Sequence, residues 1–313
     1  MHLSGSVVRR CITCVLIVMA SLLTLIGSSA TDWQESEEMS LETQYYVDYG
    51  HSAYHFYTSG VDWEEPVGLL YYFGGDYFRS SEAEVLHPNS AVMRDLAEQA
   101  ADRNLLLVVP LIPSERGPNG YTWWQDGADN AEWFLDLHQH LNTQIEPEED
   151  LIWFMGYSGG AEFISHHLLA DYHKSFGTGG ALLVGGGGPP AALDPKSREL
   201  LEPMTLKWVV GENDVAGSTN PPDWSALNSA REGEAFYHHR GVSDTTIDVL
   251  ENTDHLDYDL AVLLGEYFED IGLPSKLHSG TITAIGWSLL GVAVAAGIGT
   301  LYIWRKNRRI WDR

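Results

Sequence analysis

Cysteine is nearly absent from this sequence. Only two of its 313 residues are cysteines, Cys11 and Cys14, and both lie within the first 30 residues. The rest of the chain therefore has neither a disulfide framework nor a thiolate metal site. Histidine is more frequent, but the pairs His166-His167 and His238-His239 lack the spacing of a zinc ligand set. We expect no metal site and no cofactor.

Positive charge is also scarce. The 18 Lys and Arg residues are outnumbered by 44 Asp and Glu residues, and the formal net charge is −26. A charge of that size and sign keeps a protein soluble and repels the phosphate backbone of nucleic acids. We therefore expect no nucleic-acid partner.

The first of two long apolar runs lies near the N-terminus. It extends from Cys11 to Gly27, follows Arg9-Arg10, and is followed by the small residues Ser28-Ser29-Ala30. A basic start, a short apolar segment and small residues before a break are typical of a secretory signal peptide. We predict a signal peptide at 1–30, cleaved after Ala30; an uncleaved signal anchor is the alternative.

The second apolar run, Thr281–Trp304, contains no charged residue. About 20 helical residues at roughly 1.5 Å each cross a hydrocarbon layer of about 30 Å, so this run predicts a transmembrane helix. Five basic residues follow within 305–313, and such residues stay on the cytoplasmic side. We expect a single-pass protein of the cell membrane with a cytoplasmic basic tail and an extracytoplasmic domain.

The residues between these runs have the composition of one folded domain. Residues 31–44 are polar and acidic, which predicts a disordered lead-in, and residues 272–280 read as a linker. Residues 45–271 are enough for one domain with a full core. Short apolar runs suited to buried parallel strands occur at Val67–Phe73, Leu105–Val109, Leu151–Met155, Ala181–Val184, Leu206–Val210 and Thr246–Leu250.

Segments with helical length and spacing alternate with these strands. They are Ala91–Arg103, Ala131–Asn142, Ala161–Tyr172, Ser225–His238 and Tyr258–Asp270. Alternating strands and helices predict an α/β fold with a doubly wound, mostly parallel sheet. The functional site of such a sheet lies beyond the carboxyl ends of its strands.

The sequence Gly156-Tyr157-Ser158-Gly159-Gly160 matches the G-x-S-x-G pattern. It directly follows a predicted strand and precedes a predicted helix, which is the strand–turn–helix setting that a nucleophile elbow requires. Glycines at positions 156 and 160 avoid crowding where backbones cross. We predict that Ser158 is a nucleophile; an ordinary glycine-rich turn is the alternative.

A nucleophilic serine needs a base, and the base needs an acid to orient it. In α/β hydrolases these follow in the order Ser, Asp or Glu, His. Asp214 comes just after the predicted strand Leu206–Val210, and His255 comes just after Thr246–Leu250. We predict Asp214 as the acid, with Glu212 as its competitor, and His255 as the base.

The backbone offers donors for a developing oxyanion. The N–H of Gly159 follows the nucleophile, and the loop after Val67–Phe73 supplies the N–H groups of Gly75 and Asp76. We also predict substrate contacts from Tyr157 in the elbow and from Trp123 and Trp124, which follow another strand. Lid or core packing is the alternative for the two tryptophans.

These residues together resemble a known family. Phe73-Gly74-Gly75, the elbow, Gly211-x-x-Asp214 and His255 are similar to those of α/β-hydrolase serine esterases, of the secreted type related to polyhydroxybutyrate depolymerases and feruloyl esterases. The resemblance covers about residues 45–271. Those families often have His before the glycine pair, where this chain has Phe73, and they are commonly disulfide-bonded.

The resemblance implies ester hydrolysis through Ser158, His255 and Asp214. Combined with the two apolar runs, it leads us to expect a membrane-anchored extracytoplasmic carboxylesterase that acts on small-molecule, lipid or glycan esters. Two alternatives stay open. One is an envelope acyltransferase with the same triad, and the other is a non-catalytic receptor or scaffold with a hydrolase fold.

Overall fold

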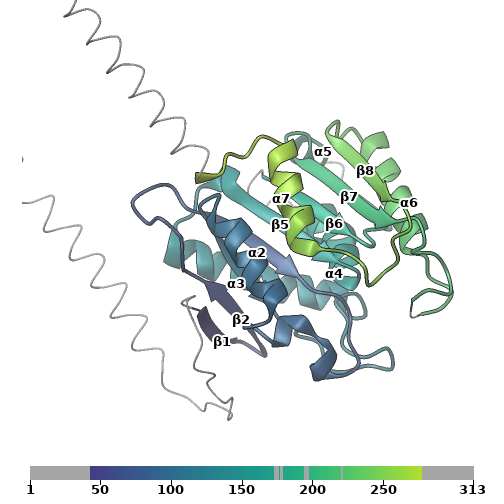
Figure 1. The fold of residues 1–313 in the computed structure, drawn as a ribbon, viewed down its shortest axis with the longest axis horizontal. Helices are drawn as coiled ribbons and strands as arrows, with labels where there is room; N and C mark the ends of the chain where they lie inside the picture. The colour runs from purple at the N-terminus through teal and green to yellow at the C-terminus, as the bar shows by residue number, and fades with distance from the viewer. Residues whose placement is uncertain (1–42, 173–175, 177–178, 194–196, 220, 277–313) are drawn as a thin grey trace, which may run out of the picture. The chain divides into compact units, whose positions relative to one another are not determined.

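An eight-stranded sheet crosses the folded part of the chain (Figure 1). The computed structural model describes residues 43–172, 176, 179–193, 197–219 and 221–276. The predicted signal peptide, transmembrane helix and basic tail, and most of the predicted lead-in, lie outside the described residues. The strands lie in the order β1-β2-β4-β3-β5-β6-β7-β8. Their bounds are β1 Thr43–Tyr49, β2 Ser52–Tyr57, β3 Gly68–Phe73, β4 Leu105–Pro110, β5 Ile152–Tyr157, β6 Gly180–Val184, β7 Thr205–Gly211 and β8 Thr245–Leu250.

The strands from β3 to β8 pair in parallel, each within two residues of a strand that the sequence predicts. Strands β3, β4 and β6 are buried along their whole length, as strands covered on both faces should be. Strand β8 is the edge of the sheet and is mostly exposed or half-buried. The mostly parallel α/β sheet is thereby confirmed.

Strands β1 and β2 are not among the predicted elements. They form an antiparallel hairpin in which Tyr49 pairs with Ser52, and β2 is antiparallel to β4. Strand β1 starts at Thr43, two residues before the predicted start of the domain. The β2 sequence SAYHFY mixes aromatic and polar residues and gives no apolar run. Its His55 is fully buried, hydrogen-bonds Val85 O at 2.8 Å through Nε2, and has its pKa lowered by burial to about 4.

Five helical segments accompany the parallel strands, as predicted, four of them between strands and the last, α7, after β8. They are α2 Ala91–Ala101, α3 Gly127–Ile145, α4 Gly159–Phe163 with its wider-turned continuation η4 Ile164–Tyr172, α6 Ala226–His239 and α7 Leu260–Asp270. A short helix α5, Ser197–Leu201, and three 3₁₀ turns, Ser80–Glu82, Glu84–Leu86 and Glu149–Leu151, complete the described helical elements. Ser90, Ser225 and Asp259 cap α2, α6 and α7 by accepting a first-turn N–H.

The helices cover both faces of the sheet. Helices α2 and α7 contact each other and lie in front of the sheet in Figure 1. On the other face α3 contacts η4, and α6 is joined to η4 by the hydrogen bond from Tyr237 OH to Ser165 O at 2.5 Å. Among the described residues, no helix has both the length and the hydropathy that crossing a bilayer requires.

The first residues of the predicted linker belong to the domain. Lys276 donates its backbone N–H to Asp102 O and its Nζ to Gly60 O, both at 2.7 Å. Ser275 is 9% exposed, and Leu273 N–H donates to Phe268 O. These contacts attach residues 272–276, the first part of the predicted linker, to α2, α7 and the loop before β3.

Candidate active site

Ser158 occupies a sharp turn between β5 and α4. Its φ of 53° and ψ of −118° lie outside the regions that most residues with a side chain adopt. The neighbouring glycines make the turn feasible. A Cβ on Gly156 would lie 2.7 Å from Ala161 N, and one on Gly160 would overlap the carbonyl oxygen of Phe73 in β3. The geometry is that of the predicted elbow.

A continuous hydrogen-bonded relay leads away from Ser158. His255 Nε2 lies 2.8 Å from Ser158 Oγ, and His255 Nδ1 lies 2.8 Å from Asp214 Oδ2. Because an ionised Asp214 only accepts, Nδ1 carries the imidazole proton and Nε2 accepts the hydroxyl proton of Ser158. The three residues follow β5, β7 and β8, at the carboxyl edge of the sheet, where the sequence places them.

Asp214 is completely buried and has more than one donor. Besides His255, the hydroxyl of Tyr258 donates to Asp214 Oδ2 at 2.7 Å and itself accepts from Gly211 N–H at 2.8 Å. Burial raises the pKa of Tyr258, and its hydrogen bond to Asp214 raises it further, so the phenol stays a donor. The competitor Glu212 lies elsewhere, with Oε2 3.4 Å from Asn252 N.

Two aromatic side chains hold His255 in place. The Tyr157 ring stacks on the imidazole with centroids 5.3 Å apart, and its hydroxyl donates to His255 O at 2.6 Å. Trp224 meets the imidazole edge-on at 5.7 Å. Tyr157, predicted as a substrate contact, is thus in contact with the proposed base, and it orients the ring that moves the proton.

The predicted oxyanion residues surround the elbow. Gly159 N–H is in the first turn of α4, where N–H groups have no acceptor within the helix. A Cβ on Gly75 would lie 3.2 Å from Ser158 Cβ, so this loop packs directly on the serine. Within the described residues, the N–H groups of Gly75 and Asp76 have no protein acceptor. Both remain available to a substrate oxygen.

Trp123 and Trp124 have different environments although they are adjacent. Trp123 is 1% exposed, stacks on Phe163 at 4.9 Å and meets Phe73 edge-on at 5.1 Å. The prediction that Trp123 contacts substrate is wrong, because the side chain is enclosed in the core. Trp124 is half-buried and donates its Nε1–H to Asp76 Oδ2 at 2.6 Å, which places it beside the oxyanion loop.

Glu162, which the sequence analysis did not single out, supports the elbow from behind. Its side chain is nearly buried and accepts from Gly187 N–H at 3.1 Å, from Gly188 N–H at 2.9 Å and from the hydroxyl of Ser229. These bonds attach the loop after β6 to α4. Its position four residues after the nucleophile is a sequence signal, but the glycine partners are visible only in the fold.

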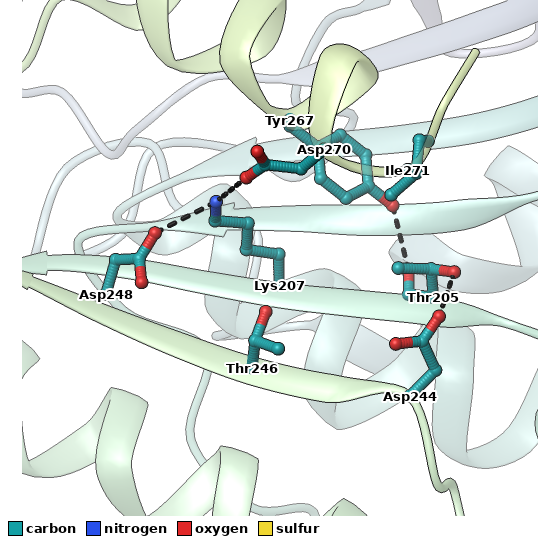
Figure 2. Close-up of a pocket in the computed structure, with 8 residues that line it drawn as sticks. All are labelled: Thr205, Lys207, Asp244, Thr246, Asp248, Tyr267, Asp270 and Ile271. Carbon is teal, nitrogen blue, oxygen red and sulfur yellow. Dashed lines mark hydrogen bonds and ion pairs between the residues drawn. The ribbon is translucent and has the colours of Figure 1, made fainter.

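A cavity lies at the opposite end of the sheet from Ser158, His255 and Asp214. Figure 2 shows it around Lys207, whose Nζ lies 2.9 Å from Asp248 and 2.5 Å from Asp270. Burial by itself would lower the pKa of Lys207, but the two hydrogen-bonded carboxylates outweigh it and raise the pKa. The cavity adjoins the first half of β7, away from the triad. Among the described residues no cluster of three or more His, Cys, Asp or Glu side chains has the geometry to hold a metal ion.

The fold resembles that of known hydrolases. A ferulic acid esterase superposes with a TM-score of 0.50 at 12% identity over 73% of this chain and 96% of that chain. A Bacillus cereus carboxylesterase matches at 17% identity and a TM-score of 0.46, over 70% of this chain and 92% of that one. An uncharacterized Bacillus cereus protein gives 15% identity and 0.47, over 81% of this chain and 66% of that one. No protein-family model and no curated protein sequence matches the chain.

The strand order, the elbow after β5 and the likeness to the ferulic acid esterase define the α/β-hydrolase fold. At this level of sequence identity the likeness concerns the fold alone. The activity depends on the site itself, because one fold supports many functions.

Proposed function

We propose that this protein is a serine hydrolase that cleaves carboxylic esters through an acyl-enzyme on Ser158. The observation that supports the proposal is the relay of two 2.8 Å contacts from Ser158 through His255 to Asp214. Such a relay activates a hydroxyl that is otherwise a weak nucleophile. The elbow exposes that hydroxyl beside the unpaired amides of the oxyanion loop.

The reaction follows from these positions. Ser158 Oγ attacks the ester carbonyl carbon while its proton moves to His255 Nε2, and the carbonyl oxygen becomes an anion near Gly159 and Gly75. The tetrahedral intermediate collapses, and the alcohol leaves with the proton from His255. A water molecule then repeats the sequence, with His255 as the base, and releases the acid and free Ser158.

Labelling and turnover test this proposal together. The purified protein should react with a fluorophosphonate probe and hydrolyse p-nitrophenyl acetate. Ser158→Ala should abolish labelling and lower turnover by about 10³-fold or more, while the fold remains intact. A scaffold would neither react nor turn over, and a glycerol or sugar acceptor added to the assay would expose an acyltransferase by its ester product.

We further propose that the enzyme is exported and anchored by residues 281–304. Support comes from the uncharged apolar run and the basic residues that follow it. Protease added to intact cells should then remove the domain and leave the basic tail protected. A domain that survives protease until the membrane is broken would contradict this topology.

The position of Lys276 predicts how such an anchored domain would be oriented. Lys276 is bonded to the loop before β3 and to the end of α2 before β4, whereas Ser158 and His255 follow strand ends. A six-residue strand is about 20 Å long, and any four residues, such as 277–280, reach at most about 14 Å. The reactive serine would then face away from the bilayer, which favours esters in the cell envelope or the medium.

A vesicle assay tests this orientation. The full chain in vesicles should hydrolyse a soluble ester as fast as the detergent-solubilised protein. Its rate of hydrolysis of a lipid ester placed in the same bilayer should be no higher than that of the detergent-solubilised protein. A large gain on the lipid ester would contradict the orientation, because anchoring would then bring the site to its substrate.

A further inference from the structure

A carboxyl group lies against the proposed oxyanion hole. Asp76 Oδ2 accepts the Trp124 Nε1–H at 2.6 Å, and the Trp123 backbone N–H also donates to the carboxyl. A Cβ on Gly159 would overlap Asp76 Oδ1 and lie 2.9 Å from Oδ2. The carboxyl therefore covers the Cα of the residue whose N–H is the first proposed donor to the oxyanion.

The surroundings of Asp76 disfavour its ionised form. Burial is the largest influence and raises the pKa of Asp76 to about 6. The hydrogen bonds from Trp124 and Trp123 act in the opposite direction. Among charged groups, Glu162 on α4 raises the pKa and His255 lowers it. The residue as a whole nevertheless remains exposed, so Asp76 is in contact with solvent.

A negative charge at this place works against the proposed reaction. The substrate oxygen acquires its negative charge beside Gly159, and like charges a few Å apart repel each other even where solvent weakens the effect. The Trp124 indole N–H is already turned toward Asp76 Oδ2. When Asp76 takes a proton from solvent the repulsion disappears, and a protonated Oδ1 becomes one more donor at the site.

We propose that Asp76 is a titrating member of the oxyanion hole: its ionised carboxylate opposes the tetrahedral intermediate, and its neutral carboxyl favours it. The proposal deepens the proposed ester hydrolysis and rests on it. It gives the enzyme a preference for mildly acidic conditions. It also means that the neutral amide of Asparagine at this position should imitate the favourable state.

The test compares wild type with Asp76→Asn from pH 4.5 to 8.5, using kcat/KM for p-nitrophenyl acetate. The amide oxygen can still accept from Trp124, so the change removes mainly the charge. We expect kcat/KM of the variant to be about ten times that of wild type above pH 7, which is a low value for two neighbouring unscreened charges. Below pH 5 this ratio should fall toward one. A ratio that is the same at every pH, or below one above pH 7, would overturn the proposal, because a purely structural role has no pH dependence.

Trp124→Phe provides the second variant. Without the indole donor the ionised carboxylate of Asp76 loses stabilisation, so its pKa should rise. The inflection in the pH profile of kcat/KM that wild type shows and Asp76→Asn lacks should then move to higher pH. The same change made in the Asp76→Asn background should move no inflection. An equal shift in both backgrounds would assign the effect to another group and overturn the proposal.

Phenylboronic acid separates this proposal from the proposed function. Its anionic tetrahedral adduct with Ser158 imitates the intermediate without turnover. Binding at pH 8 should strengthen about tenfold in Asp76→Asn, and unchanged binding would count against Asp76. Strengthened binding in a protein that hydrolyses no ester would support the role of Asp76 while overturning the proposed ester hydrolysis.

Discussion

Replacing Asp214 with Asn tests whether the relay acts as one unit. The substitution keeps the shape of the side chain and removes its charge. An amide at this position leaves His255 free to adopt the other tautomer, with Nε2 protonated and unable to accept from Ser158 Oγ. We expect kcat/KM to fall by about 10⁴-fold, as a misoriented base requires.

The effect on stability should be much smaller than the effect on activity. Asp214 is 0% exposed, and its Oδ1 has no hydrogen-bond partner among the described residues. Burying that carboxylate costs several kcal/mol, and charged hydrogen bonds from His255 and Tyr258 return about 1.5–3 kcal/mol each. Because the two contributions nearly cancel, the free energy of unfolding should change by less than about 2 kcal/mol.

Urea denaturation and p-nitrophenyl acetate turnover, measured on the same preparation, give both quantities. Glu212→Gln is the matched control, since Glu212 is an exposed carboxylate two residues away that makes only a long contact to Asn252 N. It should leave turnover within about twofold of wild type. Activity within tenfold of wild type in Asp214→Asn, or a loss in Glu212→Gln, would refute the assignment of the acid.

Three further predictions concern the framework of the site. Tyr258→Phe should lower the free energy of unfolding, measured in urea, by about 2–3 kcal/mol, because Asp214 loses a donor and the Gly211 N–H loses its acceptor. A loss below about 0.5 kcal/mol would contradict the role of these two hydrogen bonds. Gly160→Ala should cost more than about 3 kcal/mol, since its Cβ overlaps a β3 carbonyl, whereas Gly265→Ala meets only a side-chain end and should cost about 1 kcal/mol or less. His55 has its pKa lowered to about 4, so the folded protein binds fewer protons than the unfolded chain below pH 6.5; stability should fall by up to about 3 kcal/mol from pH 6.5 toward 4, and His55→Asn should lack this part of the slope.

Much of this fold could be predicted because buried parallel strands leave a direct trace in sequence. Strands such as Leu105–Pro110 are covered by helices on both faces, so every residue is apolar and the run stands out. The hairpin of β1 and β2 has no such trace. Its residues pair antiparallel at an edge, and the polar His55 is accommodated by a hydrogen bond to Val85 O that only tertiary structure provides.

The triad could be predicted for a similar reason. Ser158, Asp214 and His255 each follow a strand, and the fold brings the ends of those strands to one edge. The supporting side chains follow no such rule. Tyr258 contacts Asp214 only because the loop after His255 turns back over the end of β7. Trp123 and Trp124 differ because the first packs on Phe163 in the core and the second bonds Asp76 at the site.

Three carboxylates lie around a serine that has to generate an anion, in a protein with a formal charge of −26. Each has its own set of donors. Asp214 has a phenol and an imidazole, and in the proposed reaction its charge stabilises the imidazolium that forms. Glu162 has two backbone N–H groups and a serine hydroxyl, which fix it in the framework behind the elbow. Asp76 has an indole and one amide as donors, stays in contact with solvent, and has its pKa raised by burial to about 6. It is therefore the carboxyl whose charge, we propose, changes with pH. The three carboxyl groups are chemically alike, so their different hydrogen-bond donors are what give each of them a different role.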